Sequence, residues 1–204
     1  MQKSLKRMAT MHRMQATGLE LFYKQGYYNT SIDDILKTLS LSKGAFYYHF
    51  SSKEDFFISI IQNLLFQKVY GMLVAPMENS GNPLTKIETC LENALETAEH
   101  NENDYGFVLG NFITEFNGKN PEIMQYLKDI LKVWEVNLLN NLQKGKLDGH
   151  ISRHTDCEAV ATYIISSYMG VRTLMVEGSA RQLRYKYVQQ LRQYFRMISE
   201  REIA

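Results

Sequence analysis

Residues 26–56 read GYYNTSIDDILKTLSLSKGAFYYHFSSKEDF, and they contain the pattern of two short amphipathic helices. Apolar side chains recur at helical spacing from Ile32 to Leu39, which predicts the first of these helices. Thr30 occupies the place of its N-cap, with Asp33 three residues later in the style of a capping box. A helix with this pattern buries one face and leaves the other to solvent.

The second, very short helix is predicted over residues 43–49, after a break at Ser40. Ser42 can cap it, and Phe46 and Phe50, four residues apart, can bury one of its faces. Two short helices joined by a tight turn form a helix-turn-helix, whose second helix lies in the major groove of DNA. The sequence therefore predicts a DNA-binding module.

The residue types around the second helix suit contact with DNA. Small or hydrogen-bonding side chains at its start can approach base edges, while donors along it and before the first helix can anchor phosphates. The alternative for Tyr47, Tyr48 and His49 is a core aromatic cluster. The spacing argues against it, because Phe46 and Phe50 occupy the buried face and the residues between them must project elsewhere. The side chains expected to hold the helix in place are Ile35, Leu39, Leu41, Phe46 and Phe50. The predicted DNA-contact residues are Thr30, Ser31, Ser42, Lys43, Gly44, Ala45, Tyr47, Tyr48, His49 and Lys53.

Charge is distributed unevenly along the chain, although the 204 residues carry a formal net charge of only +1. Residues 1–60 hold eight Lys and Arg against five Asp and Glu, whereas residues 61–150 hold seven against twelve. A basic N-terminal module can approach a polyanion, and the alternative is that these charges only form solvated faces. Lys3, Lys6 and Arg7 would add sequence-independent attraction to phosphates.

The composition excludes several other classes of protein. Hydrophobic residues make up 45% of the chain and charged residues 22%, as in an ordinary globular protein. Two cysteines are too few for a disulfide scaffold and suit a reducing compartment. No uninterrupted apolar run approaches the roughly 20 residues of a membrane span, and the N-terminus lacks the apolar core of a signal peptide. We therefore expect a cytoplasmic protein without a membrane partner.

Capping signals continue along the chain and predict an all-α protein of about nine helices. A boundary is expected near residues 50–53, giving domains 1–52 and 53–204. Beyond the two short helices, the pattern predicts a helix over 5–25 ended by Gly26; one opened by Ser51 and Glu54, to about residue 74; one opened by Asn82-Pro83, to about His100; one opened by Asp104 and ended by Gly118; one opened by Asn120-Pro121, to about Lys146; one opened by Thr155 and Glu158, to Gly178; and a last one opened by Ser179 and Gln182.

The last two helices each carry a wide apolar stripe. Such a pair fits a four-helix bundle made from two copies of the chain, and the alternative is a core within one chain. A wide stripe can serve both purposes. The predicted interface residues are Ile164, Ser167, Tyr168, Val171, Leu174, Leu183, Tyr187, Leu191, Tyr194 and Phe195.

An enzyme is the alternative from another class, but no nucleophile elbow, phosphate loop or convincing acid–base pair supports it. His150, His154 and Cys157 have the spacing of metal ligands, yet the expected cap at Thr155 places both histidines before the helix begins. We therefore expect no metal, no cofactor and no catalytic residue. A run of four glutamates at mostly i,i+4 spacing indicates a solvated face, one member of which could meet a cationic ligand: Glu88, Glu92, Glu96 and Glu99.

The segment LSKGAFYYHFSSKEDFF, residues 41–57, resembles the signature of TetR-family transcriptional regulators. Residues 10–60 resemble the N-terminal domain of that family along their whole length, including LELFYKQGYYNTSIDDI. The resemblance implies a homodimer in which three N-terminal helices bind DNA and the remaining helices form an effector-binding and dimerisation domain. Ser40 stands where the family often has a turn glycine, and Gly18 replaces the usual alanine of the first helix.

The resemblance also implies regulation by a small molecule. An effector bound in the C-terminal domain would change the spacing of two DNA-binding heads and release a repressor from its operator, although activation and sequence-independent DNA binding stay open as alternatives. Within the segment 105–116, Phe107 replaces the cysteine of an electrophile-sensing subgroup, so a thiol sensor is not expected there, and Cys90 is expected to be a core residue. Bulky residues that could line the pocket, with core packing as the alternative, are Phe66, Tyr70, Phe107, Phe112, Phe116, Tyr126, Ile130 and Trp134.

Overall fold

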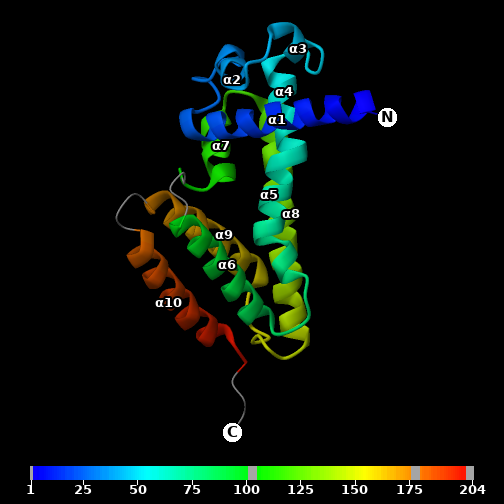
Figure 1. Ribbon diagram of the computed structural model, residues 1–204. Helices are drawn as coiled ribbons and strands as arrows, with labels where there is room; N and C mark the ends of the chain where they lie inside the picture. Colours follow the sequence, from blue (N-terminus) through cyan, green and yellow to red (C-terminus); the bar gives the residue numbers. More distant parts are fainter. Residues whose placement is uncertain (1, 101–104, 176–179, 201–204) are drawn as a thin grey trace. The chain divides into compact units, whose positions relative to one another are not determined.

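The computed structural model describes residues 2–100, 105–175 and 180–200, and their regular structure is helical (Figure 1). This confirms the predicted all-α fold class. Within these ranges the only β-type pairing is an isolated bridge between Ile151 and Ser199. The helices are α1 (Gln2–Gln25), α2 (Ile32–Leu39), α3 (Lys43–Tyr47), α4 (Lys53–Ile60), the π-helical η1 (Ile61–Leu65), α5 (Phe66–Leu73), the 3-10 helix η2 (Ala75–Met77), α6 (Pro83–Glu99), α7 (Val108–Phe116), α8 (Pro121–Leu147), α9 (Cys157–Leu174) and α10 (Ala180–Ile198).

The chain forms two compact units. The first unit comprises residues 1–68 and 108–129, and the second comprises residues 69–107 and 130–204. The boundary expected near residue 52 lies inside the first unit, because α7 and the start of α8 fold with the N-terminal helices. Both long helical stretches, α4–η1–α5 and α8, contribute to the two units.

The helix-turn-helix is formed by α2 and α3. Ser31, not Thr30, is the N-cap of α2: its hydroxyl accepts a hydrogen bond from the amide of Asp34, whose carboxylate accepts one from the amide of Ser31. The predicted box of Thr30 and Asp33 is therefore one residue too early. Thr30 is buried and donates its hydroxyl hydrogen to the Gly26 carbonyl at 2.8 Å, so its side chain is used inside the turn.

The turn between α2 and α3 has the features that the sequence predicts. Ser40 has φ +54° and ψ +42°, which is the left-handed conformation that glycine adopts at lower cost. Ser42 caps α3 by accepting a hydrogen bond from the amide of Ala45, as predicted. Gly26, with φ +87°, ends α1, also as predicted.

The start of α4 differs from the prediction by one residue. Ser52 is the N-cap and accepts from the Asp55 amide, while Asp55 accepts from the amide and hydroxyl of Ser51. Glu54 is not available for the expected capping box because its carboxylate accepts a hydrogen bond from Asn120 at 2.6 Å. The single helix predicted to reach about residue 74 is interrupted by the π-helical η1, which the periodicity does not reveal.

Aromatic side chains build the core of the first unit. Phe22, Phe46 and Phe56 are fully buried or nearly so, and Phe56 makes an edge contact with Phe46 at a centroid distance of 5.3 Å. Gly18 lies against this cluster: a Cβ placed there would meet the Phe56 ring at 2.6 Å. The glycine at this point of α1 therefore permits close packing of α1 on α4.

By length and composition alone, the helical stretch Lys53–Met77 could cross a membrane. The high hydropathy of this stretch is explained by packing, because it contributes core residues to both units. Phe57 and Ile61 are buried in the first unit, and Leu73 is buried in the second.

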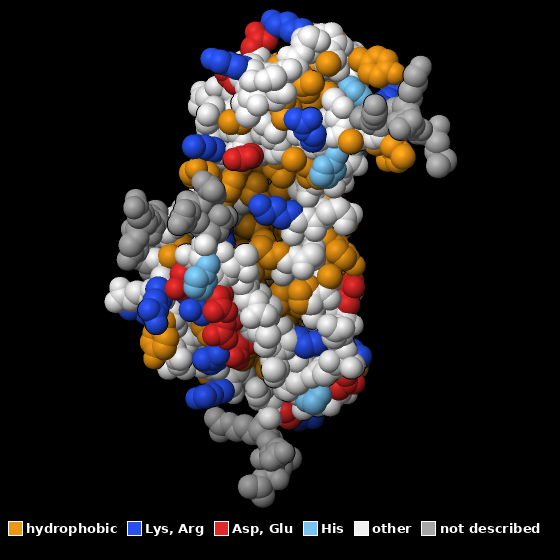
Figure 2. All heavy atoms as spheres, viewed as in Figure 1, with side chains coloured by type: hydrophobic (Ala, Val, Ile, Leu, Met, Phe, Trp, Pro, Cys, Tyr) orange, Lys and Arg blue, Asp and Glu red, His pale blue; other side chains and the backbone are white. Residues whose placement is uncertain are grey.

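In the second unit, α10 packs against both α6 and α9 (Figure 1). Three of the four glutamates of α6 are paired with arginines of α10, so the prediction of a solvated face is wrong for these three, whereas Glu96 is exposed as predicted. Arg192 contacts Glu88 at 2.6 Å and Glu92 at 2.8 Å, and Arg184 contacts Glu99 at 2.6 Å. Figure 2 shows acidic and basic side chains side by side over these two helices.

The remaining predictions of helix ends are partly corrected and partly confirmed, and some lie outside the described residues. Asp156, not Thr155, caps α9 by accepting from the amides of Glu158 and Ala159. This helix ends at Leu174, four residues before the predicted end. The opening residues Asn82 and Asn120 are confirmed, since each accepts a hydrogen bond from the first turn of its helix. Asp104, Gly178 and Ser179 lie outside the described residues.

Candidate DNA-binding site

The short helix α3 presents one face to the core and the other to solvent. Phe46 is fully buried and Phe50 is 5% exposed, whereas Tyr47 and Tyr48 are 57% and 66% exposed. The tyrosines are therefore not members of a core aromatic cluster. Ser42, Lys43 and Gly44 are exposed at the start of the helix, while Ala45 and His49 are partly exposed. The helix thus presents small and hydrogen-bonding groups to solvent, while Phe46 and Phe50 hold it against the core.

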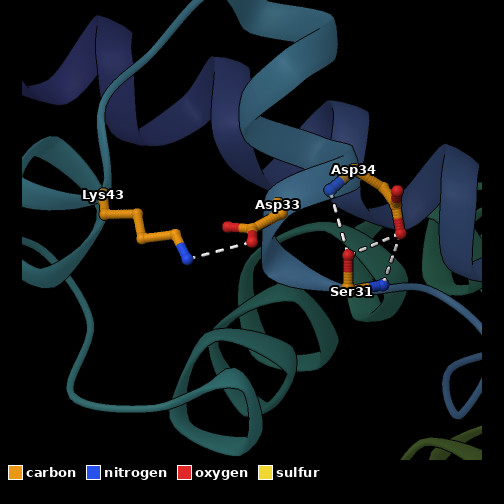
Figure 3. A network of polar contacts seen from close by, with 4 residues as sticks. All are labelled: Ser31, Asp33, Asp34 and Lys43. Atoms are coloured by element: carbon orange, nitrogen blue, oxygen red, sulfur yellow. Dashed lines mark hydrogen bonds and ion pairs between the residues drawn. The ribbon is translucent and has the colours of Figure 1, made fainter.

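An ion pair joins α2 to α3 across this surface. The Nζ atom of Lys43 lies 2.9 Å from a carboxylate oxygen of Asp33, and both side chains are well exposed (Figure 3). Asp33 raises the pKa of Lys43 through this hydrogen bond and through its charge. The neighbouring hydrogen bonds of Ser31 lower the pKa of Asp34. A phosphate or base that binds Lys43 must compete with Asp33.

A groove of about 390 Å³ brings together five of the predicted contact residues. It runs between the turn after α1, the start of α2, and α3. Its position beside exposed donors suits a phosphate of the DNA backbone. The residues that line it are Tyr28, Asn29, Thr30, Ser31, Ile32, Asp33, Lys43, Tyr47 and Lys53.

Lys53 has a structural use in this groove. Its Nζ atom donates a hydrogen bond to the Tyr27 carbonyl at 2.6 Å and lies 4.1 Å from the centroid of the Tyr27 ring. Burial lowers the pKa of Lys53, with the charges of Glu115 and Asp34 opposing that effect. The side chain points inward to the turn, as does the hydroxyl of Thr30. Both residues hold the turn in shape.

Arg7 of α1 joins the exposed face of α3. Its guanidinium lies 5.0 Å from the centroid of the Tyr48 ring, a cation–π contact. Burial lowers the pKa of His49, and the charge of Arg7 lowers it further. The sequence predicts only a sequence-independent attraction of Arg7 to phosphates. Its contact with Tyr48 could not be predicted from a local pattern, because the two residues are far apart in the chain.

Glu115 of α7 is a site residue that sequence reasoning missed. Its two carboxylate oxygens accept hydrogen bonds from the consecutive amides of Tyr27 and Tyr28, each at 3.1 Å. Phe116 packs against the same two rings, at centroid distances of 4.9 Å from Tyr27 and 5.5 Å from Tyr28. The turn between α1 and α2 is therefore held by α7. No sequence signal reports this, because a single glutamate on a helix is ordinary.

The predicted effector residues fall into both units. Phe66, Phe112, Phe116 and Tyr126 belong to the first unit, where Phe112 and Phe116 pack against the Phe57 ring at 5.0 and 5.3 Å. Tyr70, Phe107, Ile130 and Trp134 belong to the second unit. There the rings of Phe107 and Trp134 lie 6.0 Å apart, and both contact Tyr168.

The predicted interface residues divide by exposure. On α9, Ile164 and Tyr168 are fully buried within the second unit, whereas Leu174 is 61% exposed. On α10, Leu191 and Phe195 are buried. Val171 is also buried, and Ser167, Leu183, Tyr187 and Tyr194 are partly exposed.

The cysteines are buried and reduced. Burial raises the pKa of Cys90 to about 12, and its thiol donates to the Met72 carbonyl at 3.3 Å. Cys90 is therefore a core residue, as predicted, and its thiol has low reactivity because little of it is ionised. In the part of the chain that the structure describes, no cluster of His, Cys, Asp and Glu could hold a metal ion.

Two family models match the chain. Residues 16–60 match the model of bacterial regulatory proteins, tetR family, and include α2, α3 and the exposed tyrosines. Residues 83–186 match the model of the tetracyclin repressor-like, C-terminal domain. The chain belongs to the TetR family. The resemblance seen in the sequence is thereby confirmed, and the protein is a DNA-binding transcriptional regulator of that family.

Individual relatives agree with this TetR-family assignment. The HTH-type transcriptional repressor DhaR of Mycobacterium sp. (strain GP1) is 25% identical over 154 residues, which cover 75% of each chain. A TetR transcriptional regulator from Chloroflexus aurantiacus has the same fold, with a TM-score of 0.84 and 22% identity over 95% of this chain and 98% of that one. FadR of Bacillus subtilis, solved in complex with stearoyl-CoA, has a TM-score of 0.71 and 19% identity over 88% and 96% of the two chains.

Proposed function

We propose that this TetR-family regulator is a cytoplasmic, homodimeric repressor that leaves its operator when a small molecule binds in the second unit. The observation that carries the proposal is the exposed face of α3, with Tyr47 and Tyr48 displayed above the buried Phe46. Large aromatic side chains with hydroxyl groups that stand in solvent beside basic residues suit contact with DNA. Repression released by a ligand is typical of the family.

The roles of the contact residues follow from their positions. Lys43, Gly44 and Ala45 begin α3 and would lie nearest the base edges, with Lys43 exchanging Asp33 for an acceptor on DNA. Tyr47, Tyr48 and His49 would contact phosphates, together with Ser31, Ser42 and Arg7. Thr30 and Lys53 would act indirectly, because their polar atoms already bond the turn before α2.

The second unit would supply the dimer contact through α9 and α10. Exposed apolar side chains on these two helices are available to a second copy: Tyr163, Leu174, Tyr185 and Met197. Ile164 and Tyr168 would support the interface from beneath, since they are buried within one chain. The proposal includes no catalytic activity and no cofactor.

The test is fluorescence anisotropy of the full chain with labelled DNA from upstream of its own gene. A random duplex of equal length runs alongside, at two salt concentrations. Tyr48→Ala should bind the upstream fragment at least about tenfold more weakly, as expected when contacts to phosphate are lost. Leu147→Ala is the matched control, because Leu147 is 87% exposed but lies at the end of α8.

Three results are informative. Tight binding to the upstream DNA that Tyr48→Ala loses and Leu147→Ala keeps supports the proposal. Equal, salt-sensitive binding to both duplexes favours the sequence-independent alternative. Absence of binding to either duplex at low salt contradicts the assignment of α3 as a recognition helix.

A further inference from the structure

Trp134 of α8 buries a hydrogen-bond donor without a partner in the described part of the protein. The side chain is fully buried, and its Nε1 atom has no acceptor there. The indole N–H can only donate, so water or a protein acceptor would normally satisfy it. A buried donor without an acceptor costs about 1–3 kcal/mol, and such groups in native proteins need a reason.

Two other rings pack against the indole ring of Trp134 within the second unit. The ring centroids of Phe107 and Tyr168 lie 6.0 and 5.6 Å from the centroid of the Trp134 ring and 5.4 Å from each other. The interplanar angles are between 68° and 84°. The three rings thus form a triangle of edge-to-face contacts. Phe107 lies in the non-helical link before α7, whereas the other two rings belong to α8 and α9. Of the three, the Phe107 ring can move without bending a helix.

A second donor lies beside this triangle. Arg172, one turn after Tyr168 on α9, is 5% exposed and donates from Nη2 to the Gly106 carbonyl at 2.6 Å. Gly106 has φ +97° and precedes Phe107, so Arg172 holds the backbone that carries the ring. The guanidinium also places a positive charge near the cluster, which disfavours a cationic ligand.

We propose that the triangle of Phe107, Trp134 and Tyr168 is the effector site, and that its ligand is a small, flat, neutral or anionic molecule with a carbonyl or carboxylate oxygen. The oxygen accepts the hydrogen bond of the Trp134 Nε1–H, and the flat body replaces the edge of Phe107 against the other rings. The link displaced with Phe107 continues directly into α7, whose Glu115 holds the turn before α2. This inference rests on the proposed function, which it deepens by naming the effector class.

The chain has one tryptophan, so its indole gives a single cross-peak in a ¹H–¹⁵N spectrum of the full-length protein. Benzoate, benzamide, toluene and benzylammonium share a ring and differ in their polar group. Each is titrated to 10 mM, because ligands of this size bind weakly. We expect benzoate or benzamide to shift the indole proton downfield in a saturable manner. Toluene and benzylammonium should leave it unchanged.

Trp134→Phe keeps an aromatic ring and removes the donor. Isothermal titration of the active probe should show binding at least about tenfold weaker in this variant, the loss expected for one hydrogen bond to a charged or strongly polar acceptor. Leu147→Ala is again the control, since Leu147 is 87% exposed at the end of α8, the helix that carries Trp134. The probe series on the unmodified protein does not depend on how well the variant folds.

Each contrary result has a distinct meaning. An indole peak that no acceptor-bearing probe moves, or that toluene moves equally, overturns the inference; so does equal binding by Trp134→Phe. Anisotropy with the upstream DNA is measured in parallel. Specific DNA binding with an unresponsive indole would refute only the effector class, whereas a responsive indole without DNA binding would refute the repressor.

Discussion

Gly44 illustrates how one residue can matter for DNA contact and not for folding. A Cβ at this position would meet only the Ser42 hydroxyl, at 3.8 Å, so the folded chain has room for a side chain. Gly44→Ala should therefore leave the melting temperature unchanged or raise it, since alanine favours a helix by up to about 1 kcal/mol. If α3 approaches base edges here, the added methyl group should weaken operator binding severalfold. Anisotropy and thermal melts measure the two effects.

Gly71→Ala provides the comparison for this prediction. Gly71 is an exposed helical glycine of α5, and a Cβ there meets nothing within 4 Å. The substitution should have a similar effect on stability and none on DNA binding. Equal DNA affinity for both variants would show that the backbone of α3 does not approach DNA closely at Gly44.

His49 should make DNA binding depend on pH. Burial and the charge of Arg7 lower its pKa in the free protein, which favours the neutral form of the histidine. A nearby phosphate would raise the pKa of His49 in the complex. Binding to DNA would then be coupled to the uptake of a proton, so the affinity would increase as pH falls. Affinity at constant ionic strength should rise from pH 8 to pH 6, by at most about tenfold per pH unit for one proton. His49→Gln should flatten this dependence; an unchanged profile would exclude His49 as its origin.

The same shift has the opposite sign for stability. The unfolded chain binds a proton at His49 more readily than the folded chain does, since the pKa of the folded histidine is below 6.5. Its effect on stability is therefore absent well above pH 6.5 and becomes a loss as pH falls through that value. Urea unfolding at pH 7.5 and 5.5 should show a smaller loss in His49→Gln.

At the scale of elements, α7 is part of the DNA-binding head although it lies far along the chain. Glu115 accepts from the amides of Tyr27 and Tyr28, and Lys119, just beyond α7, places its Nζ 4.9 Å from the centroid of the Tyr28 ring. Asn120 reaches Glu54 at the start of α4. Helix α7 therefore controls the geometry of the turn that precedes α2, and this turn borders the groove of the DNA-binding surface.

Glu115→Ala should loosen that turn. The amides of Tyr27 and Tyr28 lose their acceptors, so their hydrogen exchange should accelerate and operator affinity should fall by about tenfold or more if the turn is needed for contact. Glu122→Ala removes an exposed carboxylate from the first turn of α8 and should change neither measurement. Normal exchange at residues 27–28 in Glu115→Ala would contradict the role of this carboxylate.

Partly buried charges join α6 to α10. Arg192 bridges Glu88 and Glu92, and its side chain is 36% exposed. Arg192→Ala leaves two neighbouring carboxylates without their cation and should lower the free energy of unfolding by about 1–2 kcal/mol. Arg196→Ala, one turn later and exposed, should cost little. Equal urea midpoints for the two variants would show that the bridge contributes nothing.

For the whole molecule, the proposed dimer implies a geometric rule for its operator. Two rigidly joined heads must reach half-sites on the same face of DNA, about one helical turn apart or a multiple of it. Inserting 5 base pairs, about half a turn, between the half-sites should abolish tight binding, whereas inserting 10 restores the face and should recover part of it. Gel-shift assays with the two altered operators test this. Tight binding to both would indicate heads that bind independently.

Local chemistry in the sequence determined the helices and the recognition surface. Gly26, Ser42, Asn82 and Asn120 mark helix ends through bonds within a few residues, so they can be read from the chain alone. The spacing of Phe46 and Phe50 likewise implied that the tyrosines between them are exposed. Where two neighbouring residues could each cap a helix, as with Thr30 and Ser31, the choice depended on which one the turn buries.

Only the tertiary structure decided the long-range pairs. Glu115 with the turn after α1, Arg192 with the glutamates of α6, and Lys53 with the Tyr27 carbonyl join residues that are far apart in the chain. An isolated charged residue on a helix has the same local pattern whether it faces water, a backbone amide or another charge. Burial makes the difference, because a buried polar group must find a partner, and the partner is set by how the helices pack. For the same reason, only the folded structure shows that the indole N–H of Trp134 is buried without an acceptor among the described residues.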